Sequence, residues 1–319
     1  MKFTTHSLFE IITYLASHLK QSNWCSFEVL NPDLFEHTYN GEIVTVNGED
    51  YLYRGLKAWV NLAELLGCKI SIPTIKSNNL VEITFKKLQT SNSFHTLQPI
   101  SKEEKYGSNS LFAKIQKNEE PNFLYHYKKA LESVSISQRK NILNLGINRG
   151  DEFEIIKSMM SLEDFSKLNL VGIDHSYSAL QIAKERFPQA SFLKDDINDM
   201  SKLNLGRFGL IISIGTLQTP SINYKQFLMY LVQNHLDANS AIILGFPNSR
   251  WIDGELLYGA KAPNYNYAEM SLMFNDVIFA KKYLQQKKFR VTITGREYIF
   301  VTATKIGSSQ KRPYDKGHH

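Results

Sequence analysis

One stretch, NILNLGINRGDEFEIIKSMMSLEDFSKLNLVGID from Asn141 to Asp174, limits the fold more than any other part of the chain. Its first residues form a short apolar run that predicts a buried parallel strand. Gly146 and Gly150 then flank a turn, and a helix is expected to follow. A second apolar strand over 168–173 ends at Asp174. The order of strand, glycine loop, helix and strand predicts a βαβ unit.

The loop and the acid of this unit suit a nucleoside. Glycines let the backbone pass close to a ligand, and a carboxylate at the tip of the next strand accepts hydrogen bonds from a ribose diol. Asp174 follows the loop by about 20–30 residues, as expected for such a unit. The dinucleotide fingerprint G-x-G-x-x-G is absent, because Gly146, Asn148 and Gly150 fall at alternate positions. The alternative is an ordinary βαβ turn that needs glycine for its dihedral angles.

Strands and helices keep alternating after Asp174. We expect three further strands, over 190–193, 210–214 and 241–246. Helices of ten residues or more are expected over 224–236 and 267–286, and a terminal hairpin over 290–294 and 298–304. A helix within 175–188, with Ser176 as a candidate N-cap and Pro188 beyond its end, precedes them. The predicted fold class is α/β, with a doubly wound, mostly parallel seven-stranded sheet that ends in an antiparallel hairpin.

The segment before this region predicts a smaller unit. An amphipathic helix over 7–20, a hairpin at Asn47-Gly48, a helix over 56–67 and a strand pair over 69–72 and 80–88 indicate an α+β module. We therefore expect four parts. They are a module of unknown role over 1–90, a polar linker over 91–122, the α/β domain over 123–306, and a disordered tail over 307–319 whose GHH resembles a tag remnant.

Four motifs in a fixed order resemble the class I S-adenosylmethionine-dependent methyltransferases over residues 123–305. They are ILNLGINRG, VGID, FLKDDINDM and RFGLIISIGTLQ, and the terminal hairpin resembles the antiparallel last strand of that fold. The chain departs from the family where Asn144 and Gly209 stand in place of acids and Asn148 replaces the middle glycine. Asparagine tolerates the left-handed conformation better than other non-glycine residues, so the loop is expected to survive.

The resemblance implies S-adenosylmethionine as cofactor and S-adenosylhomocysteine as product. Asp174 is expected to bind the ribose hydroxyls, and Asp196, or alternatively Asp195, the adenine amino group. The implied cofactor-binding residues are Asn144, Gly146, Asn148, Gly150, Asp174, His175, Asp195, Asp196, Ile197, Ser213 and Gly215. Tyr106 and Phe112 in the linker are candidates for a lid by analogy; the alternative is that they only dock the linker.

The methyl acceptor is expected to meet a long segment after the fifth strand, FPNSRWIDGELLYGAKAPNYNYAEMSLMF. Long structured loops above a rigid sheet are usually functional. The candidate substrate residues are Gln218, Asn248, Arg250, Trp251, Tyr258 and Tyr265. Alternatively, the aromatic side chains pack the loop onto the domain. No residue is assigned as catalytic base. An NPPY-like motif and a Pro-Cys nucleophile are absent, which disfavours amino methylation of DNA bases and carbon-5 methylation of pyrimidines.

Charge and composition bear on partners and compartment. The net charge is +6, and the basic residues Lys281, Lys282, Lys287, Lys288 and Arg290 gather in one predicted helix and its exit. This helix is a candidate for nucleic-acid contact, although such patches are more often solvated faces. No apolar run reaches the roughly 18–20 residues that span a bilayer, and the start of the chain is unlike a signal peptide. Two distant cysteines argue against disulfides and a zinc site, so a cytoplasmic protein without bound metal is expected.

The leading function is methyl transfer to a small-molecule or RNA acceptor. The alternative is a non-catalytic RNA- or protein-binding adaptor with a degenerate methyltransferase-like domain, which the replaced acids at Asn144 and Gly209 favour. A third reading, an NAD-dependent oxidoreductase, is disfavoured by the missing G-x-G-x-x-G fingerprint.

Overall fold

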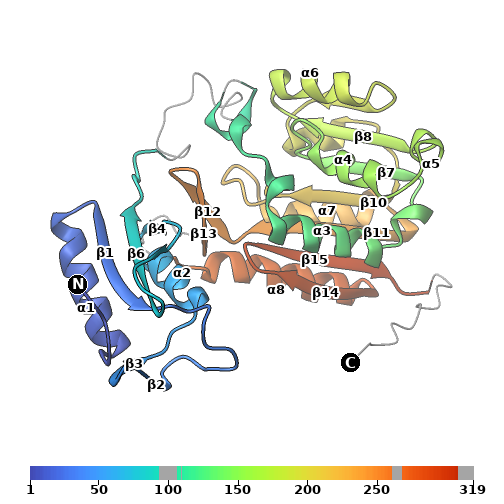
Figure 1. The fold of residues 1–319 in the computed structure, drawn as a ribbon. Helices are drawn as coiled ribbons and strands as arrows, with labels where there is room; N and C mark the ends of the chain where they lie inside the picture. Colours follow the sequence, from blue (N-terminus) through green and yellow to red (C-terminus); the bar gives the residue numbers. More distant parts are fainter. Residues whose placement is uncertain (93–105, 109, 261–267, 308–319) are drawn as a thin grey trace. The chain divides into compact units, whose positions relative to one another are not determined.

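The computed structural model describes residues 1–92, 106–108, 110–260 and 268–307. The chain divides into two compact units, which are treated separately below (Figure 1). The first unit comprises 1–96 together with 251–257, and the second comprises 97–250 together with 258–319.

The first unit is an antiparallel sheet packed against two helices. Alternate residues of the strands point into its core, as Phe27, Val29 and Ile83 do, while the helices contribute Ile11 and Trp59. The strand order is β1-β6-β4, and β5 also pairs with β6. The elements are α1 (Leu8–Gln21), β1 (Trp24–Leu30), α2 (Leu56–Leu65), β4 (Cys68–Ile70), β5 (Thr74–Ile75) and β6 (Leu80–Lys87).

A separate hairpin in this unit joins β2 (Ile43–Val46) to β3 (Glu49–Leu52). Its turn residues, Asn47 and Gly48, both have positive φ, at 50° and 81°. Two-residue hairpin turns need this backbone, and Asn-Gly adopts it at low cost, so the predicted hairpin is confirmed.

The second unit is built on a seven-stranded sheet in the order β14-β15-β11-β10-β7-β8-β9 (Figure 1). Neighbouring strands are parallel except around β15, which runs antiparallel to both β11 and β14. The predicted α/β class, the seven strands and the antiparallel terminal hairpin are therefore confirmed. The strands are β7 (Asn141–Leu145), β8 (Asn169–Asp174), β9 (Ser191–Lys194), β10 (Phe208–Ile214), β11 (Leu236–Pro247), β14 (Phe289–Gly295) and β15 (Tyr298–Lys305).

Helices cover both faces of this sheet. Alternate residues of β7 pack into two different cores: Leu143 and Leu145 into one, and Ile142 into the other. Residues of α7 and α8 share the first core, whereas residues of α3, α4, α5 and α6 share the second. The helices are α3 (Pro121–Ser133), α4 (Asp151–Ser158), α5 (Leu162–Ser166), α6 (Tyr177–Arg186), α7 (Tyr224–Asn234) and α8 (Ser271–Gln286), with short 3-10 helices η2 (Leu111–Lys114), η3 (Lys117–Glu119), η4 (Ile136–Gln138) and η5 (Ile197–Lys202).

Some elements of the structure differ from the predictions or were not predicted. The described part of the polar linker predicted over 91–122 contains two short 3-10 helices, η2 and η3. Strand β1 and helix α5 were not predicted. The segment after β11, predicted as loop, contains a hairpin of β12 (Ser249–Ile252) and β13 (Glu255–Tyr258), whose tip belongs to the first unit. The expected tail over 307–319 lies almost entirely outside the described residues.

Candidate functional site

The loop between β7 and α4 keeps a left-handed backbone at three alternate positions. Gly146, Asn148 and Gly150 have φ values of 74°, 48° and 86°. The N–H groups of Gly146 and Ile147 both donate to the carbonyl oxygen of Ile173, at 2.8 and 3.1 Å, which ties the loop to the end of β8. Asn148 thus adopts the left-handed conformation expected of the glycine whose place it takes, as the sequence predicts.

Asp174 lies at the carboxyl end of β8, beside this loop. Its side chain is 6% exposed, and its two oxygens accept from different backbone groups. The Asn148 N–H donates to Oδ2 at 2.8 Å, and the Ser176 N–H donates to Oδ1 at 2.9 Å. Each carboxylate oxygen has a second lone pair, so Asp174 retains acceptor capacity for a ligand. The exposed His175 ring places Nδ1 at 3.8 Å from Asp174 Oδ1.

The segment after β9 lies close to Asp174. The Asp195 N–H donates to the Asp174 carbonyl oxygen at 3.1 Å. Asp196 is exposed, and its Oδ1 accepts from the Asn198 N–H at 2.9 Å, which caps the start of η5. Ile197 is buried in the core that α7 and α8 share. This backbone hydrogen bond therefore holds both candidates for the adenine contact, Asp195 and Asp196, close to the predicted ribose acid.

The loop after β10 completes this edge of the sheet. Ser213 is buried, and its Oγ donates to the Leu145 carbonyl oxygen at 3.3 Å. Gly215 is exposed with a φ of 73°, and its N–H donates to the Gly245 carbonyl oxygen. The side-chain Oε1 of Gln218 is buried without a hydrogen-bond partner among the described residues. These residues and the glycine loop share the carboxyl edge of the parallel strands, where open α/β sheets bind ligands.

Thr216 packs closely against Gly146. A Cβ on Gly146 would lie 1.9 Å from Thr216 Oγ1 and 2.8 Å from its Cβ. Glycine is therefore required at this position for two reasons, the positive φ and the close approach of the two loops.

We expect Gly146→Ala to destabilise the second unit by more than the about 1–2 kcal/mol of the left-handed conformation alone. Gly206→Ala is the matched control, because Gly206 has nearly the same φ, 73°, and nothing within 4 Å of the added carbon. Thermal unfolding of both variants measures the difference. Equal melting temperatures would contradict the steric role of Thr216.

The residues upstream of α3 dock onto the glycine loop. Asn148 Nδ2 donates to the Tyr106 carbonyl oxygen at 2.8 Å, and Arg149 donates to the carbonyl oxygens of Ala113 and Ile115. The Tyr106 and Phe112 rings meet edge to face at 5.1 Å, and burial raises the pKa of the Tyr106 hydroxyl. This placement supports both interpretations of these two aromatic residues, because a docked linker and a lid would contact the loop alike.

A buried ion pair links this upstream segment to α4. Lys117 Nζ lies 2.5 Å from Glu152 Oε1, with side-chain exposures of 14% and 1%. Burial raises the pKa of Glu152 more than Lys117 lowers it. Burial lowers the pKa of Lys117, but the Glu152 and Asp151 carboxylates raise it by more, so Lys117 stays charged. Sequence reasoning missed this pair, since an acid in the first turn of a helix is usually explained by the helix dipole.

The neighbouring Asp151 is held by arginines. Arg186 donates to its Oδ1 at 2.7 Å, and the Arg149 guanidinium lies 3.5 Å from Oδ2. Burial raises the pKa of Asp151, but Lys117 and these two arginines lower it by more, so the net shift is downward. Asp151 is thus a carboxylate with its charge already balanced.

Asn144 is fully buried two residues before the glycine loop. Neither its Oδ1 nor its Nδ2 has a hydrogen-bond partner among the described residues. Its alternation with Ile142 along β7 places it on the face that α3 and α4 cover. Unpartnered buried amides are rare in folded proteins and call for an explanation.

The predicted acceptor residues are spread over the segment after β11. Asn248 is 1% exposed and is engaged within the loop: Nδ2 donates to the Arg296 carbonyl oxygen, and Oδ1 accepts from the Ala260 N–H. Arg250 Nε donates to the Gly259 carbonyl oxygen at 3.0 Å. Tyr258 lies under the Arg296 guanidinium, at 5.3 Å from the ring centroid. Trp251 is partly buried and belongs to the first unit, and Tyr265 lies outside the described residues.

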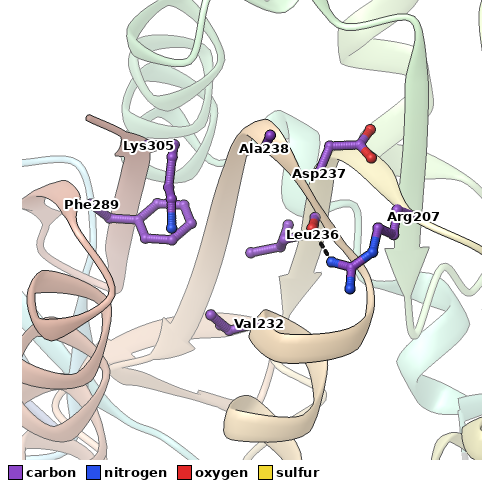
Figure 2. A pocket seen from close by; sticks show the side chains of 7 residues that line it. All are labelled: Arg207, Val232, Leu236, Asp237, Ala238, Phe289 and Lys305. Carbon is purple, nitrogen blue, oxygen red and sulfur yellow. Dashed lines mark hydrogen bonds between the residues drawn. The ribbon is translucent and has the colours of Figure 1, made fainter. Parts of the chain in front are cut away.

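A pocket at the opposite, amino edge of the sheet has two cations at its sides (Figure 2). Arg207 donates to the carbonyl oxygens of Leu236 and Gln233, and Lys305 Nζ donates to that of Lys287. Both cations therefore already bind backbone acceptors. The pocket is lined by Arg207, Val232, Leu236, Asp237, Ala238, Phe289 and Lys305. Because it lies at the amino ends of the parallel strands, we place the candidate site at the other edge.

Searches for metal and membrane features cover the described part of the chain only. There, no group of three or more His, Cys, Asp or Glu side chains is arranged to hold a metal ion. No helix within those residues has the length and apolar character to cross a bilayer. Cys25 and Cys68 are buried free thiols, and burial raises the pKa of Cys68 to about 11.

No family model and no curated protein matches this chain. Solved structures similar to it include three methyltransferases. The magnesium protoporphyrin IX methyltransferase of Synechocystis PCC 6803 with bound S-adenosylmethionine is 13% identical, with a TM-score of 0.40 over 64% of this chain and 94% of that one. A SAM-dependent methyltransferase of Aquifex aeolicus is 16% identical, with a TM-score of 0.42 over 61% and 98%. A TehB-like SAM-dependent methyltransferase of Corynebacterium glutamicum is 16% identical, with a TM-score of 0.38 over 56% and 86%.

Five neighbouring strands, in the order β11-β10-β7-β8-β9, are parallel. Beyond β11 the reversed strand β15 lies between β11 and the edge strand β14. That reversed strand separates this sheet from ordinary dinucleotide-binding domains. In fold, the chain resembles the class I S-adenosylmethionine-dependent methyltransferases.

Proposed function

We propose that this protein is an S-adenosylmethionine-dependent methyltransferase. The observation that carries the proposal is the position of Asp174, a buried carboxylate at the tip of β8 that receives a hydrogen bond from the glycine loop and retains free lone pairs. A ribose diol would use those lone pairs, and Asp195 or Asp196, which follow the next strand β9, would meet the adenine amino group.

The residues at this edge fit the cofactor in two further ways. The glycine loop allows a close approach of backbone to ligand, and Asn144 beside it offers buried polar atoms without partners. When bound, S-adenosylmethionine supplies an electrophilic methyl group. The chain would then contribute mainly position and exclusion of water, because a nucleophile must line up with that methyl group in a shielded site. No side chain is assigned as general base.

A small-molecule acceptor fits the second unit better than direct delivery of RNA by the basic C-terminal helix. Lys287, Lys288 and Arg290 flank the start of β14, at the amino edge of the sheet. Strand β10 has seven residues, so this edge lies roughly 20 Å from the carboxyl edge. RNA bound to these cations would have to extend over this distance to bring its acceptor atom to the candidate site, whereas a small molecule can bind at the carboxyl edge directly.

Calorimetry with S-adenosylhomocysteine, S-adenosylmethionine and NAD tests the proposed function. We expect micromolar or tighter binding of S-adenosylhomocysteine and no heat with NAD. Absence of S-adenosylhomocysteine binding at millimolar concentration would refute the proposal and favour the adaptor, for which the replaced acids at Asn144 and Gly209 argue. If S-adenosylhomocysteine binds, a methylation assay on metabolite extract and on total RNA would identify the acceptor class.

A further inference from the structure

The sheet of the first unit has a second face, opposite to the one that α1 and α2 cover. Alternate residues of β1 and β6 pack into the core that these two helices share, so the residues between them point to the other side. Ser26 Oγ and Thr84 Oγ1 lie 2.6 Å apart there. Leu30 and Leu80, at one end of this face, pack against residues of the β2–β3 hairpin, whereas the residues at the other end are exposed.

Three exposed side chains form a row across the exposed end. Trp24 is the Cα partner of Lys86 in the pairing of β1 with β6, and Lys69 is the Cα partner of Lys86 in the pairing of β4 with β6. Cys68 and Ile70, on either side of Lys69, pack toward the core, which directs Lys69 to the opposite face. We define the surface row as Trp24, Lys86 and Lys69.

The two lysines of the surface row lie opposite each other on neighbouring strands. Like charges in this position destabilise a sheet. Neither ammonium takes part in an ion pair with another described residue. The Asn92 amide, the Gln89 N–H and the charge of Lys69 lower the pKa of Asp253, so this carboxylate offsets part of one charge only. An anion bound by both ammonium groups would relieve their repulsion.

Trp24 adds a flat apolar surface at the end of the row. Its side chain is 58% exposed. Its backbone is held by the Ser22 hydroxyl, which accepts from the Trp24 N–H at 3.3 Å and donates to the Trp24 carbonyl oxygen at 2.8 Å. The Lys87 N–H donates to the Asn23 carbonyl oxygen, so Trp24 and Lys86 form the next, non-hydrogen-bonded pair, in which side chains come closest.

An exposed aromatic ring beside two cations suits a single-stranded nucleic acid. Every base has a face that can stack on an aromatic side chain, and the phosphates of the same strand bind cations. A duplex keeps its base faces inside its own stack, so it could use only the lysines. The neighbouring pair on this face, Ser26 and Thr84, is polar, and a polar surroundings suits a nucleic acid better than the apolar core of a protein interface.

We propose that the surface row binds single-stranded nucleic acid, with a base stacked on Trp24 and phosphates on Lys86 and Lys69. Glu28 lies farther along the same face and repels phosphates, which limits the strand to the end that carries the row. The site lies within the first unit and does not depend on the proposed methyl transfer.

Fluorescence anisotropy with a labelled oligouridylate of about ten nucleotides tests the stacking contact. Trp24→Ala should weaken binding at least about fivefold, which is the low end of what one base stacked on an aromatic side chain contributes. Trp24→Phe should retain most of the affinity, because a smaller ring still stacks. Phe9→Ala is the matched control, since Phe9 is an 80% exposed aromatic residue on α1, away from this face.

Salt dependence tests the phosphate contacts. Two such contacts predict that the logarithm of the affinity falls with the logarithm of salt concentration with a slope of about −1.4. The double variant Lys69→Gln/Lys86→Gln should bring this slope close to zero, whereas Lys57→Gln, at an exposed lysine of α2, should leave it unchanged. Inorganic polyphosphate is the ligand without bases, and Trp24→Ala should leave its affinity unaltered.

An oligodeoxyuridylate of equal length distinguishes DNA from RNA, and binding of either strand supports the surface row. The inference is overturned if the wild type binds neither oligonucleotide, or if Trp24→Ala binds both as the wild type does. Loss of binding in Lys281→Gln/Lys282→Gln, with full binding in the variants of the surface row, would place the strand on α8 and overturn it too. Calorimetry with S-adenosylhomocysteine tests the proposed function separately, because the surface row lies outside the second unit.

Discussion

Lys117→Met is expected to lower the free energy of unfolding of the second unit by about 3–5 kcal/mol. The reason is the burial of its partner: Glu152 is 1% exposed and would remain without any opposite charge in contact. Breaking one side of a buried pair is far more harmful than breaking an exposed one. Lys129→Met is the matched control, because Lys129 pairs with Glu132 on the exposed side of α3, and such pairs contribute at most about 0.5 kcal/mol.

The double variant Lys117→Met/Glu152→Met makes this prediction sharper. Removing both charges also removes the unpaired buried carboxylate, so much of the lost stability should return. Urea unfolding of the two single variants and the double variant measures the coupling. If Lys117→Met costs no more than Lys129→Met, the pair is not a buried ion pair in solution.

The same variant should depend on pH in a defined direction. Burial raises the folded-state pKa of Glu152 above its ordinary value of 4.5, and loss of Lys117 should raise it further. A carboxyl with a raised folded pKa favours folding most below its unfolded pKa and loses that contribution as pH rises through the folded pKa. The stability deficit of Lys117→Met should therefore be smaller near pH 4.5 than at pH 7.

Much of the second unit was predictable because its signals are local. Strand β7, the left-handed loop and the acid at the tip of β8 are consecutive in the sequence, and the loop conformation follows from Gly146 and Gly150. The alternation of strands and helices then limits the topology to a doubly wound sheet. Even the exception at Asn148 was predictable, since asparagine tolerates a positive φ.

The features that the sequence did not reveal depend on distant partners. Lys117 and Glu152 meet only after the upstream segment docks on α4, and neither residue has a neighbour in the sequence that indicates this contact. Thr216 approaches Gly146 because β10 lies beside β7 in the sheet. Strand β1 was missed although Cys25, Phe27 and Val29 alternate with polar residues, because a pattern over so few residues is weak without its partner β6.

Asp174→Ala is expected to weaken S-adenosylhomocysteine binding at least about 100-fold. Two hydrogen bonds from ribose hydroxyls to a carboxylate contribute about 1.5–3 kcal/mol each, and 1.4 kcal/mol corresponds to a factor of ten in affinity. The comparison that isolates the contact uses the 2′-deoxy analogue of S-adenosylhomocysteine. Loss of the 2′-hydroxyl should weaken binding to the wild type strongly and to the variant hardly at all.

Asp174 also has a structural task, which the controls must separate from binding. Its oxygens accept from the Asn148 and Ser176 N–H groups, so the alanine variant loses two local hydrogen bonds. Asp199→Ala, at a partly exposed acid on η5, controls for the loss of a carboxylate from the same side of the unit. A carboxylate that holds the ribose cannot be removed without changing the effect of the 2′-hydroxyl on affinity. If Asp174→Ala lowers the melting temperature but keeps the wild-type ratio of affinities for S-adenosylhomocysteine and its 2′-deoxy analogue, Asp174 therefore only anchors the loop to α6.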